Sequence, residues 1–521
     1  MLNIPAKISR NIFYLSLTAI AIALPLSLFL LSLAQIVLLI NWLIEEKLSD
    51  RWKKIKQTPA VWFIALFYLI HLAGLLWTTD FNYGSHDIKI KLPFLVIPVI
   101  IGTTEPVNKL WLKRILQFYI AGVVISSLYS TYIVVNLHGN LISQLKTVSP
   151  FVSHIRLSLM VTGALFIQGW LIFQTEKKWL KLLYIITGIW LFAFLFILQA
   201  FTGIIILAIT SVILIVYWAF KTRQLMIQWF ILILVLTFIL LTATYTVHFY
   251  TRYFSPLPID TSKLDKYTLN GNAYWSDPKA VNIENGNYIY LYICDKELRK
   301  EWNRISKIKF DSTTSNGSEI KYTIYRYLTA KGLRKDSAGL ARLTPDDIRN
   351  IENNIANPIY LQKFGLHARI YLMMWELYHY YHGSNPTGFS VAQRIEYLKT
   401  AFGIIHRHFW LGTGTGDVVN EFQKQYELDK SPLAMEWRLR AHNQLVTFWL
   451  TFGLIGFLGI VASIFVPPFI LHKYKNYLFM SFFLIFVLSM MNEDTLETHA
   501  GISYIAFFYG LFLFYKPENE N

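Results

Sequence analysis

The chain changes from polar to apolar within one stretch, Ala441-His442-Asn443-Gln444-Leu445-Val446-Thr447-Phe448-Trp449-Leu450-Thr451-Phe452-Gly453-Leu454-Ile455-Gly456. The apolar part continues to about residue 466, which is long enough to cross the hydrocarbon core of a bilayer as a helix. His442 and Asn443 therefore stand at the mouth of a predicted membrane helix. A titratable imidazole and an amide at that point are positioned to meet substrates that arrive at the membrane surface.

Apolar stretches of this kind recur along the chain. Of its 521 residues, 54% are hydrophobic and only 15% are charged, whereas charged residues make up about a quarter of an ordinary soluble protein. The apolar residues come in runs of roughly 18 to 25, the length of membrane-spanning helices. We therefore predict an all-α polytopic membrane protein.

The formal net charge of +16 could indicate a nucleic-acid partner. The basic residues, however, concentrate in short loops between the apolar runs, most densely over residues 45–59. By the positive-inside rule such loops are cytoplasmic. The charge therefore reflects membrane orientation, and we expect no nucleic-acid partner.

About twelve membrane helices follow from the apolar runs, and the loops that should lie inside are the basic ones. Both termini are then cytoplasmic. The expected spans are about 11–24, 26–44, 60–78, 92–102, 115–135, 157–173, 182–198, 204–220, 227–247, 443–466, 478–491 and 502–514.

This pattern predicts three parts: residues 1–247 with helices one to nine, a large outer loop domain over 248–441, and residues 442–521 with helices ten to twelve. The loop should be helical with a small strand-containing insertion at 255–340. Asn285-Gly286 is a turn signal before a run of strand formers at 287–293. Thr344 and Pro345 read as the start of a helix through about residue 353, and 360–381 and 391–406 have helical periodicity.

Polar residues gather near the end of the outer loop. Arg394 follows a turn and opens a predicted helix that ends near Arg407. Arginine suits a diphosphate because its planar fork donates paired, charge-assisted hydrogen bonds. The glycine run at 412–417 lacks the Lys-Ser/Thr ending and the parallel-strand context of a nucleotide loop, so we interpret it as a flexible turn between two helices at the membrane surface.

We expect no metal and no cofactor. The single cysteine, Cys294, excludes a Cys-based metal site. His406 and His408 are two apart, which points them to different faces of a helix. Glu493 and Glu497 would share a helical face within an acidic outer cluster, but they have no matched ligand set.

His442-Asn443, nine residues, Gly453, two residues and Gly456 fit the pattern His-(Asn/Ser/Gln)-x9-Gly-x-x-(Gly/Thr/Tyr) of O-antigen ligases. The chain resembles this family of Wzy/WaaL-type integral-membrane glycosyltransferases along almost its whole length, including the long loop before the tenth span. The helix of Arg394 followed by Leu411-Gly412-Thr413-Gly414 also resembles the family's loop core.

The resemblance implies transfer of a glycan from an undecaprenyl-diphosphate carrier to an acceptor hydroxyl, typically on the lipid A core. The reaction would occur at the periplasmic face of the bacterial inner membrane, without ATP or metal. Carried over by position, Arg394 would hold the diphosphate and His442 would act as general base or orient the acceptor. Asn443 could fix the histidine or bind the glycan, and Arg407 is a further candidate for substrate binding.

One position departs from the family pattern. The family carries a Ser-Arg pair before the eighth span, where this chain has Ala200-Phe201-Thr202-Gly203. Another cation would have to bind phosphate there. Arg156, at the outer end of the sixth span, is the first candidate, because a charge so close to hydrocarbon is costly unless it faces protein or ligand. A snorkelling arginine is the alternative, and Lys91 is a weaker substitute.

Two other functions stay open at this point. An O-antigen polymerase would use the same carrier but join repeat units to each other, and the His-Asn pattern favours the ligase over it. A transporter of lipid-linked sugars would need ionisable residues in mid-membrane positions. His71 is the clearest of the few in this chain.

Overall fold

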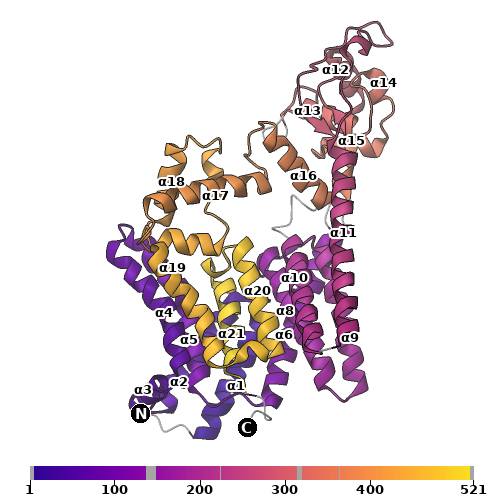
Figure 1. Ribbon diagram of the computed structural model, residues 1–521. Coiled ribbons are helices and arrows are strands. Elements are labelled where there is room, and N and C mark those ends of the chain that lie inside the picture. The colour runs from indigo at the N-terminus through magenta and orange to yellow at the C-terminus, as the bar shows by residue number, and fades with distance from the viewer. Residues whose placement is uncertain (1–4, 137–147, 223, 314–318, 363, 517–521) are drawn as a thin grey trace. The chain divides into compact units, whose positions relative to one another are not determined.

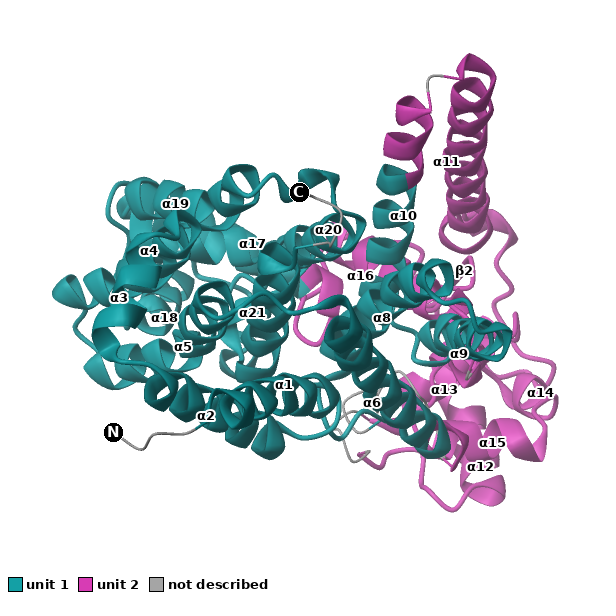
Figure 2. Ribbon diagram, turned by 90° about the horizontal axis from the view of Figure 1, so that it is seen from below, with its two compact units in different colours: residues 1–133, 146–214, 393–521 teal, residues 134–145, 215–392 magenta. Residues whose placement is uncertain are grey.

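The computed structural model describes residues 5–136, 148–222, 224–313, 319–362 and 364–516 and is almost entirely helical (Figure 1). It divides into two compact units (Figure 2). Unit 1 comprises residues 1–133, 146–214 and 393–521, and unit 2 comprises 134–145 and 215–392. The segment 248–441, which we expected to form one loop domain, is thus shared between the units, with the division at residue 392.

Unit 1 holds the helices of both ends of the chain. Helices α6, α10 and α17 cross a unit boundary. The elements are α1 (Ala6–Ala23), α2 (Leu28–Glu45), α3 (Leu48–Lys56), α4 (Pro59–Ala73), η1 (Gly74–Trp77), α5 (Phe81–Thr103), α6 (Lys109–Asn136), α8 (His154–Gln174), α9 (Lys178–Ile197), α10 (Phe201–Lys221), α17 (Ser390–Arg407), α18 (Val418–Leu428), η5 (Met435–Trp437), α19 (Gln444–Ile470), η6 (Lys473–Lys475), α20 (Tyr477–Asn492), η7 (Thr495–Glu497) and α21 (His499–Phe514).

Among the described residues, eight helices are long and apolar enough to cross a membrane: α2, α4 with η1, α6, α8, α9, α10, α11 (Leu225–Phe254) and α19. Helices α20 and α21 are shorter and apolar. The protein is thus a multi-pass membrane protein. Each of the twelve predicted runs overlaps one of these helices, the other two being α1 and α5. The run at 92–102 is only the second half of α5, which continues through Pro93 and Pro98.

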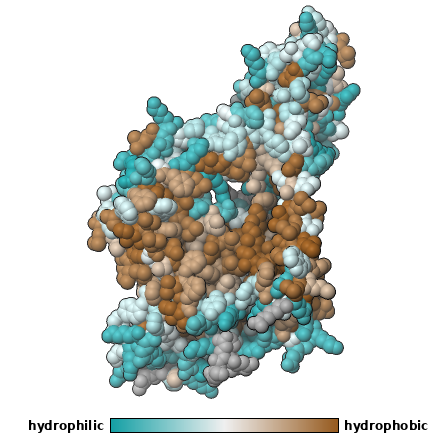
Figure 3. Space-filling model, viewed as in Figure 1, coloured by the Kyte–Doolittle hydropathy of each residue, from teal (hydrophilic) through white to brown (hydrophobic). Residues whose placement is uncertain are grey.

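The outer surface of these helices is hydrophobic. Figure 3 shows a broad hydrophobic area over the helices of unit 1. Large apolar side chains such as Phe29 on α2 and Phe173 on α8 are 76% and 89% exposed. So much exposed apolar surface is stable only against lipid or another protein. It identifies the face that contacts the bilayer.

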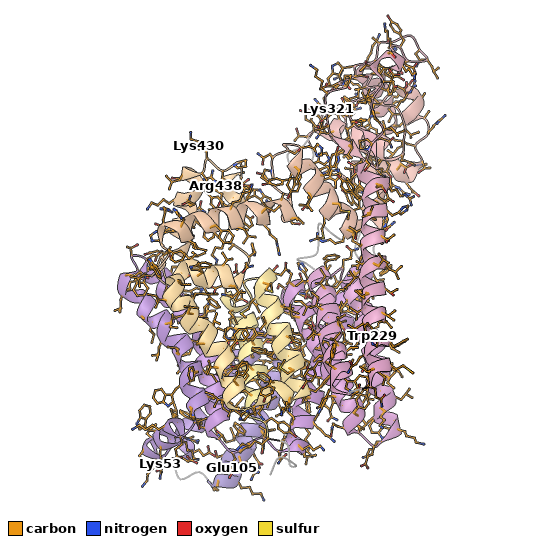
Figure 4. The ribbon with its side chains drawn as sticks, viewed as in Figure 1. Lys53, Glu105, Trp229, Lys321, Lys430 and Arg438 are labelled. Carbon is orange, nitrogen blue, oxygen red and sulfur yellow. The ribbon has the colours of Figure 1, made fainter. Side chains whose placement is uncertain are left out.

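The two ends of the unit 1 helices are polar and distinct. Lys53 of the basic helix α3 and Glu105 lie at one end, whereas Lys430 and Arg438 lie at the other (Figure 4). Helix α1 begins and α21 ends at the end where α3 lies (Figure 1). The N- and C-terminal helices therefore open and close on the same side as the densest basic loop.

The helix packing brings three helix ends together. Helix α19 packs against α4, α21 packs against α5, and α20 contacts both α8 and α21. Asn443 caps α19, because its Oδ1 accepts the Val446 amide at 3.1 Å. The segment between α20 and α21, residues 493–498, lies beside this cap. The candidate site is built there.

Unit 2 contains α11, η3 (Thr261–Lys263), β1 (Ile283–Glu284), β2 (Asn287–Tyr288), α12 (Asp295–Ile305), α13 (Ile320–Ala330), α14 (Ser337–Leu340), α15 (Pro345–Glu352), η4 (Pro358–Leu361) and α16 (His367–Tyr381). The predicted turn at Asn285-Gly286 is confirmed, since it joins the antiparallel strands β1 and β2. The predicted strand over 287–293 is wrong beyond Tyr288. Tyr292 has φ of +56°, a left-handed conformation that ends extended pairing.

The helix predictions of this region fare better. Helix α15 begins with a capping box, in which the Thr344 hydroxyl and the Asp347 carboxylate each accept a backbone amide of the other residue. Helix α17 matches the predicted helix at 391–406. The predicted helix at 360–381 begins only at His367, because Gly365 has φ of +86° and separates α16 from η4.

Candidate functional site

A cluster of charged side chains lies where α17, α19 and the 493–498 segment meet in unit 1. Its first pair joins Arg394 to Glu493. The Arg394 guanidinium donates to Glu493 Oε1, and its Nη1 donates to the backbone and side-chain oxygens of Asn492 at 2.9 and 3.1 Å. The Arg394 side chain remains one-third exposed. It can therefore still offer donors to an anionic ligand.

His442 meets the same carboxylate. Its Nδ1 lies 3.9 Å from Glu493 Oε2, and its ring lies 5.6 Å from that of Tyr397 on α17. The backbone of His442 has φ of +49°, which is uncommon for a residue with a Cβ and typical of positions held by their surroundings. The conformation turns the chain into α19 while the imidazole stays beside Glu493.

Burial sets the protonation state of His442. It lowers the pKa of the imidazole below the ordinary 6.5, although Asp494 and Glu493 act in the opposite direction. Asp494 in turn has a raised pKa because it is buried, with Arg440 opposing the shift. Thr447 of α19 donates to Asp494 at 2.8 Å. At neutral pH, His442 is therefore an uncharged imidazole that can accept a proton.

A second, deeper network centres on Glu497. Lys91 of α5 lies 2.8 Å from Glu497 Oε1 and 3.2 Å from Asp87, and Arg440 lies 3.2 Å from Glu497 Oε2. Gln444 clamps the same segment, since it donates to Glu497 at 2.8 Å and accepts the Leu496 amide at 2.9 Å. These contacts fix the 493–498 segment against α5 and α19.

The charges of this network largely compensate each other. Burial alone would raise the pKa of Glu497, but Lys91 and Arg440 outweigh it and hold that pKa well below its ordinary value. Lys91 is 1% exposed and also donates to the Leu496 carbonyl at 2.9 Å. Lys91 was a candidate phosphate ligand, yet its ammonium group is engaged inside the protein.

Asn443 likewise has both polar atoms engaged. Its Oδ1 caps α19, and its Nδ2 donates to the Met491 carbonyl at the end of α20 with a length of 2.8 Å. The amide thus ties the start of α19 to the end of α20. Neither of these hydrogen bonds involves the imidazole of His442.

The position of the missing family arginine lies close to this cluster. Asn492 donates to Thr202, the residue after Ala200-Phe201, at 2.9 Å. Gly203 packs against Ser158 of α8, where a Cβ would lie only 2.7 Å from the Ser158 Cβ. Arg156 lies two residues before Ser158 on α8, and its charge interacts with Glu493 and Asp494.

The guanidinium of Arg156 has at least one hydrogen-bond donor without a protein acceptor among the described residues. Its Nη1 donates to Ser153 at 2.8 Å, while its Nε is buried with no hydrogen-bond partner among the described residues. A buried guanidinium nitrogen without a partner is costly. Arg407, by contrast, pairs with Glu421 of α18 at 3.0 Å, and no described contact joins it to the cluster around Glu493.

The glycine run packs against a break in α19. Gly453 has φ of +62° and ψ of −174° inside that helix, a conformation that only glycine adopts readily. The break frees backbone groups, and the glycine segment satisfies them. Thr413 and Gly414 donate to the carbonyls of Leu450 and Thr451, each at 2.9 Å.

The two segments approach so closely that side chains have no room. A Cβ on Gly453 would lie 2.2 Å from the Trp410 carbonyl, and one on Gly412 would lie 2.3 Å from that of Thr451. Our interpretation of residues 412–417 as a flexible turn is therefore wrong, because all six residues are buried. Asp417 completes the anchor by accepting the Thr79 and Asp80 amides at 2.8 Å.

Sequence reasoning missed half of the cluster. It singled out Arg394, His442, Asn443 and Arg156 but not Arg440, and it considered Glu493 and Glu497 only as metal ligands on one helical face. Those two glutamates lie in a connection with the short helix η7. No group of three or more possible metal ligands occurs within the described part of the chain. The sequence did contain one indication of these ion pairs: the segment with Glu493 and Glu497 is acidic, and the outer loop before α19 is basic.

Comparison with known families identifies part of the chain. Residues 348–461 match the family model described as O-antigen ligase. This stretch of the chain is thus similar to the O-antigen ligase family, in agreement with the resemblance stated from the sequence. No curated protein matches the chain. The matched residues include Arg394, His442, Asn443 and Gly453, and they exclude Arg156, Glu493 and Glu497.

Proposed function

We propose that this chain, whose residues 348–461 match the O-antigen ligase family, is a glycosyltransferase. It would move a glycan from an undecaprenyl-diphosphate carrier to an acceptor hydroxyl, with the lipid A core as the acceptor. The observation that carries the proposal is that Arg394 and His442, far apart in the loop, contact one carboxylate. A cation for the leaving group and a neutral base for the acceptor are the two groups that such a transfer needs.

In the proposed reaction, the bond between the sugar C1 and the carrier phosphate oxygen breaks. The electron pair leaves with undecaprenyl diphosphate, and Arg394 and Arg156 stabilise the negative charge that develops on it. A bond forms between C1 and the acceptor oxygen. The acceptor proton passes to His442. Exchange of the glycosyl diphosphate for a glycosidic bond supplies the driving force, so the step needs no ATP.

The state of His442 supports its part as the base. Since burial keeps its pKa below the ordinary value, the imidazole is free to accept a proton at neutral pH. The imidazolium that forms would be stabilised by Glu493 and Asp494, which lie close to it. Glu493 would therefore have two roles: it would hold Arg394 in place, and it would balance the positive charge on His442 once the imidazole is protonated.

The remaining candidates act less directly in this proposal. Asn443 and Lys91 are positioning residues, because their polar atoms bind Met491 and the 493–498 segment. The ion pair between Arg440 and Glu497 helps to position the same segment. Arg407 pairs with Glu421, and the proposal gives it no part in the diphosphate site.

We further propose the membrane arrangement in which twelve helices span the bacterial inner membrane and both termini are cytoplasmic. The basic helix α3 supports this orientation through the positive-inside rule. The cluster around Glu493 would then open to the periplasm, where the carrier presents its glycan. Membrane lipid would cover the exposed apolar belt.

A deletion strain tests the proposal. Envelope glycolipids separated on a gel should lack long chains on the lipid A core, while long chains accumulate on the carrier. Cores that bear a single repeat unit would instead indicate a polymerase. Loss of the ladder with carrier-linked glycan retained on the cytoplasmic side would indicate a transporter, and an unchanged ladder would contradict the proposal.

A further inference from the structure

The insertion in unit 2 has a hydrophobic core of its own, which lies almost entirely before the family match. Its buried residues come from α12, α13 and the segments that flank them: Ile289, Ile293, Leu298, Trp302, Phe310, Ile320, Ile324, Tyr325, Tyr327, Leu328, Leu340, Leu343 and Ile351. The O-antigen ligase match begins only at residue 348. The proposed transfer reaction assigns no function to this folded insertion.

A cavity of about 650 Å³ opens on this insertion. That volume falls within the roughly 300–1,000 Å³ of sites for small ligands. Four aromatic side chains line it: Trp275, Tyr290, Tyr322 and Tyr325. Trp275 is 57% exposed and Tyr322 is 43% exposed. Two large aromatic side chains exposed in one concavity, rather than scattered singly, indicate a binding surface.

The aromatic walls are held rigidly. Trp275 pairs with Ile293 through two backbone hydrogen bonds of 2.7 and 2.9 Å, and its ring stands at 79° to that of Tyr290. On the opposite wall, Tyr322 stands at 87° to Tyr325. The paired backbone and the neighbouring rings restrict these side chains, which reduces the conformational entropy lost when a ligand stacks on them.

Polar groups surround the aromatic faces. The Tyr325 hydroxyl donates to Asp295, and Lys296 donates to Asn272 at 3.0 Å. Lys321 lies on α13 next to Tyr322, with its Nζ 5.1 Å from the ring centre (Figure 4). The cavity thus combines apolar ring faces with carboxylate, amide and ammonium groups at its edge.

We propose that this cavity binds hexopyranose units of a polysaccharide chain. A pyranose presents C–H groups on its ring face and hydroxyls around its edge, which match an aromatic wall and a polar rim. A purely apolar ligand would displace water from Asp295, Asn272 and Lys296 without offering hydrogen bonds in its place. The site concerns binding alone and goes beyond the proposed transfer reaction.

The test uses the full-length protein in detergent and, as probe, fluorescently end-labelled polysaccharide released by mild acid from the envelope of the cells that make the protein. Equilibrium dialysis measures its affinity. Trp275→Ala and Tyr322→Ala should each weaken binding at least tenfold. Trp275→Phe keeps an aromatic face and should bind within about threefold of the unchanged protein.

Controls separate this site from the transfer centre. All variants are made on an Arg394→Ala, His442→Ala background, so that binding at the proposed reaction centre is reduced in every sample. Tyr381→Ala removes a tyrosine that is 74% exposed on α16 and should bind like its parent. Thermal melting checks that each variant is folded.

Absence of polysaccharide binding to the parent protein would overturn the proposal. So would a folded Trp275→Ala, Tyr322→Ala double variant that binds within twofold of its parent. Displacement of the polysaccharide by an equal mass of unfolded casein would assign the cavity to peptides instead. Loss of transfer in the Arg394 and His442 variants is a separate result, which tests the proposed function and not this site.

Discussion

Arg394 and His442 meet opposite oxygens of one carboxylate, that of Glu493. The guanidinium donates to Oε1, and the imidazole Nδ1 lies 3.9 Å from Oε2. The three residues come from α17, from the entry of α19 and from the segment after α20. A single carboxylate therefore sets the distance between the cation and the base, and it links the two halves of the proposed chemistry.

The protonation state of His442 predicts the pH profile of transfer. A general base works in its uncharged form, which dominates above its pKa, and burial places that pKa below 6.5. We expect the rate to be constant near neutral pH and to fall only as the pH drops below 6.5. Initial rates of the purified protein between pH 5 and 8 measure this. An acidic limb centred above pH 7 would show that His442 is not a buried neutral base.

Glu493→Gln should slow transfer and shift that limb. Removing the charge frees Arg394 from its partner and takes away one group that raises the pKa of His442. The acidic limb should therefore move to lower pH, and the rate at neutral pH should fall about 10- to 100-fold, as for partners that orient reacting groups. Glu421→Gln changes the carboxylate that pairs with Arg407 and serves as the control. An unshifted limb in Glu493→Gln would separate Glu493 from His442.

Gly453→Ala should prevent stable folding of the site. The alanine would need φ of +62° with ψ of −174°, and its Cβ would meet the Trp410 carbonyl. Together, strain and overlap should cost about 3 kcal/mol or more, seen as a lower melting temperature in detergent. Gly459→Ala lies on the same helix, where the added Cβ meets only the tip of the Ile70 side chain. Equal melting of both variants would contradict the close approach.

Lys91→Met tests the network below the site. It leaves Asp87 and Glu497 buried without their shared cation, and breaking a buried pair in this way costs about 3–5 kcal/mol. Lys89→Met removes an exposed lysine from the same helix and should leave the melting temperature within a degree or two. If both variants melt alike, Lys91 does not hold the 493–498 segment.

The membrane helices could be predicted because the signal is local. Most apolar runs contain enough residues to span a bilayer, and caps such as Thr344 are visible in the sequence. The prediction of a strand at 287–293 was wrong. Ile289 and Ile293 are apolar because they pack into a small core, and the positive φ of Tyr292 turns the chain between them. The strand propensity of a segment does not report its contacts with residues that are distant in the sequence.

The site was only half predictable for the same reason. Motif spacing identified His442 and Gly453, and arginine chemistry identified Arg394. That Arg394 and His442 meet at Glu493 depends on how α17, α19 and α20 pack, which no local pattern contains. Arg440 was missed because its role depends on an ion pair with Glu497, which is 57 positions away in the sequence. Gly453 was recognised as part of a motif, but its physical reason, the backbone of Trp410, appears only in the fold.

The most direct test is transfer in proteoliposomes. The donor is radiolabelled glycan on undecaprenyl diphosphate from a strain that lacks the protein, and the acceptor is lipopolysaccharide without O-chains. His442→Ala and Arg394→Ala should each lower the initial rate at least about 100-fold, whereas the exposed His406→Ala control should keep it. The double variant should be only slightly slower than the single ones, because the two residues act as a unit. Parent-level transfer by either folded single variant would contradict the assignment of this centre.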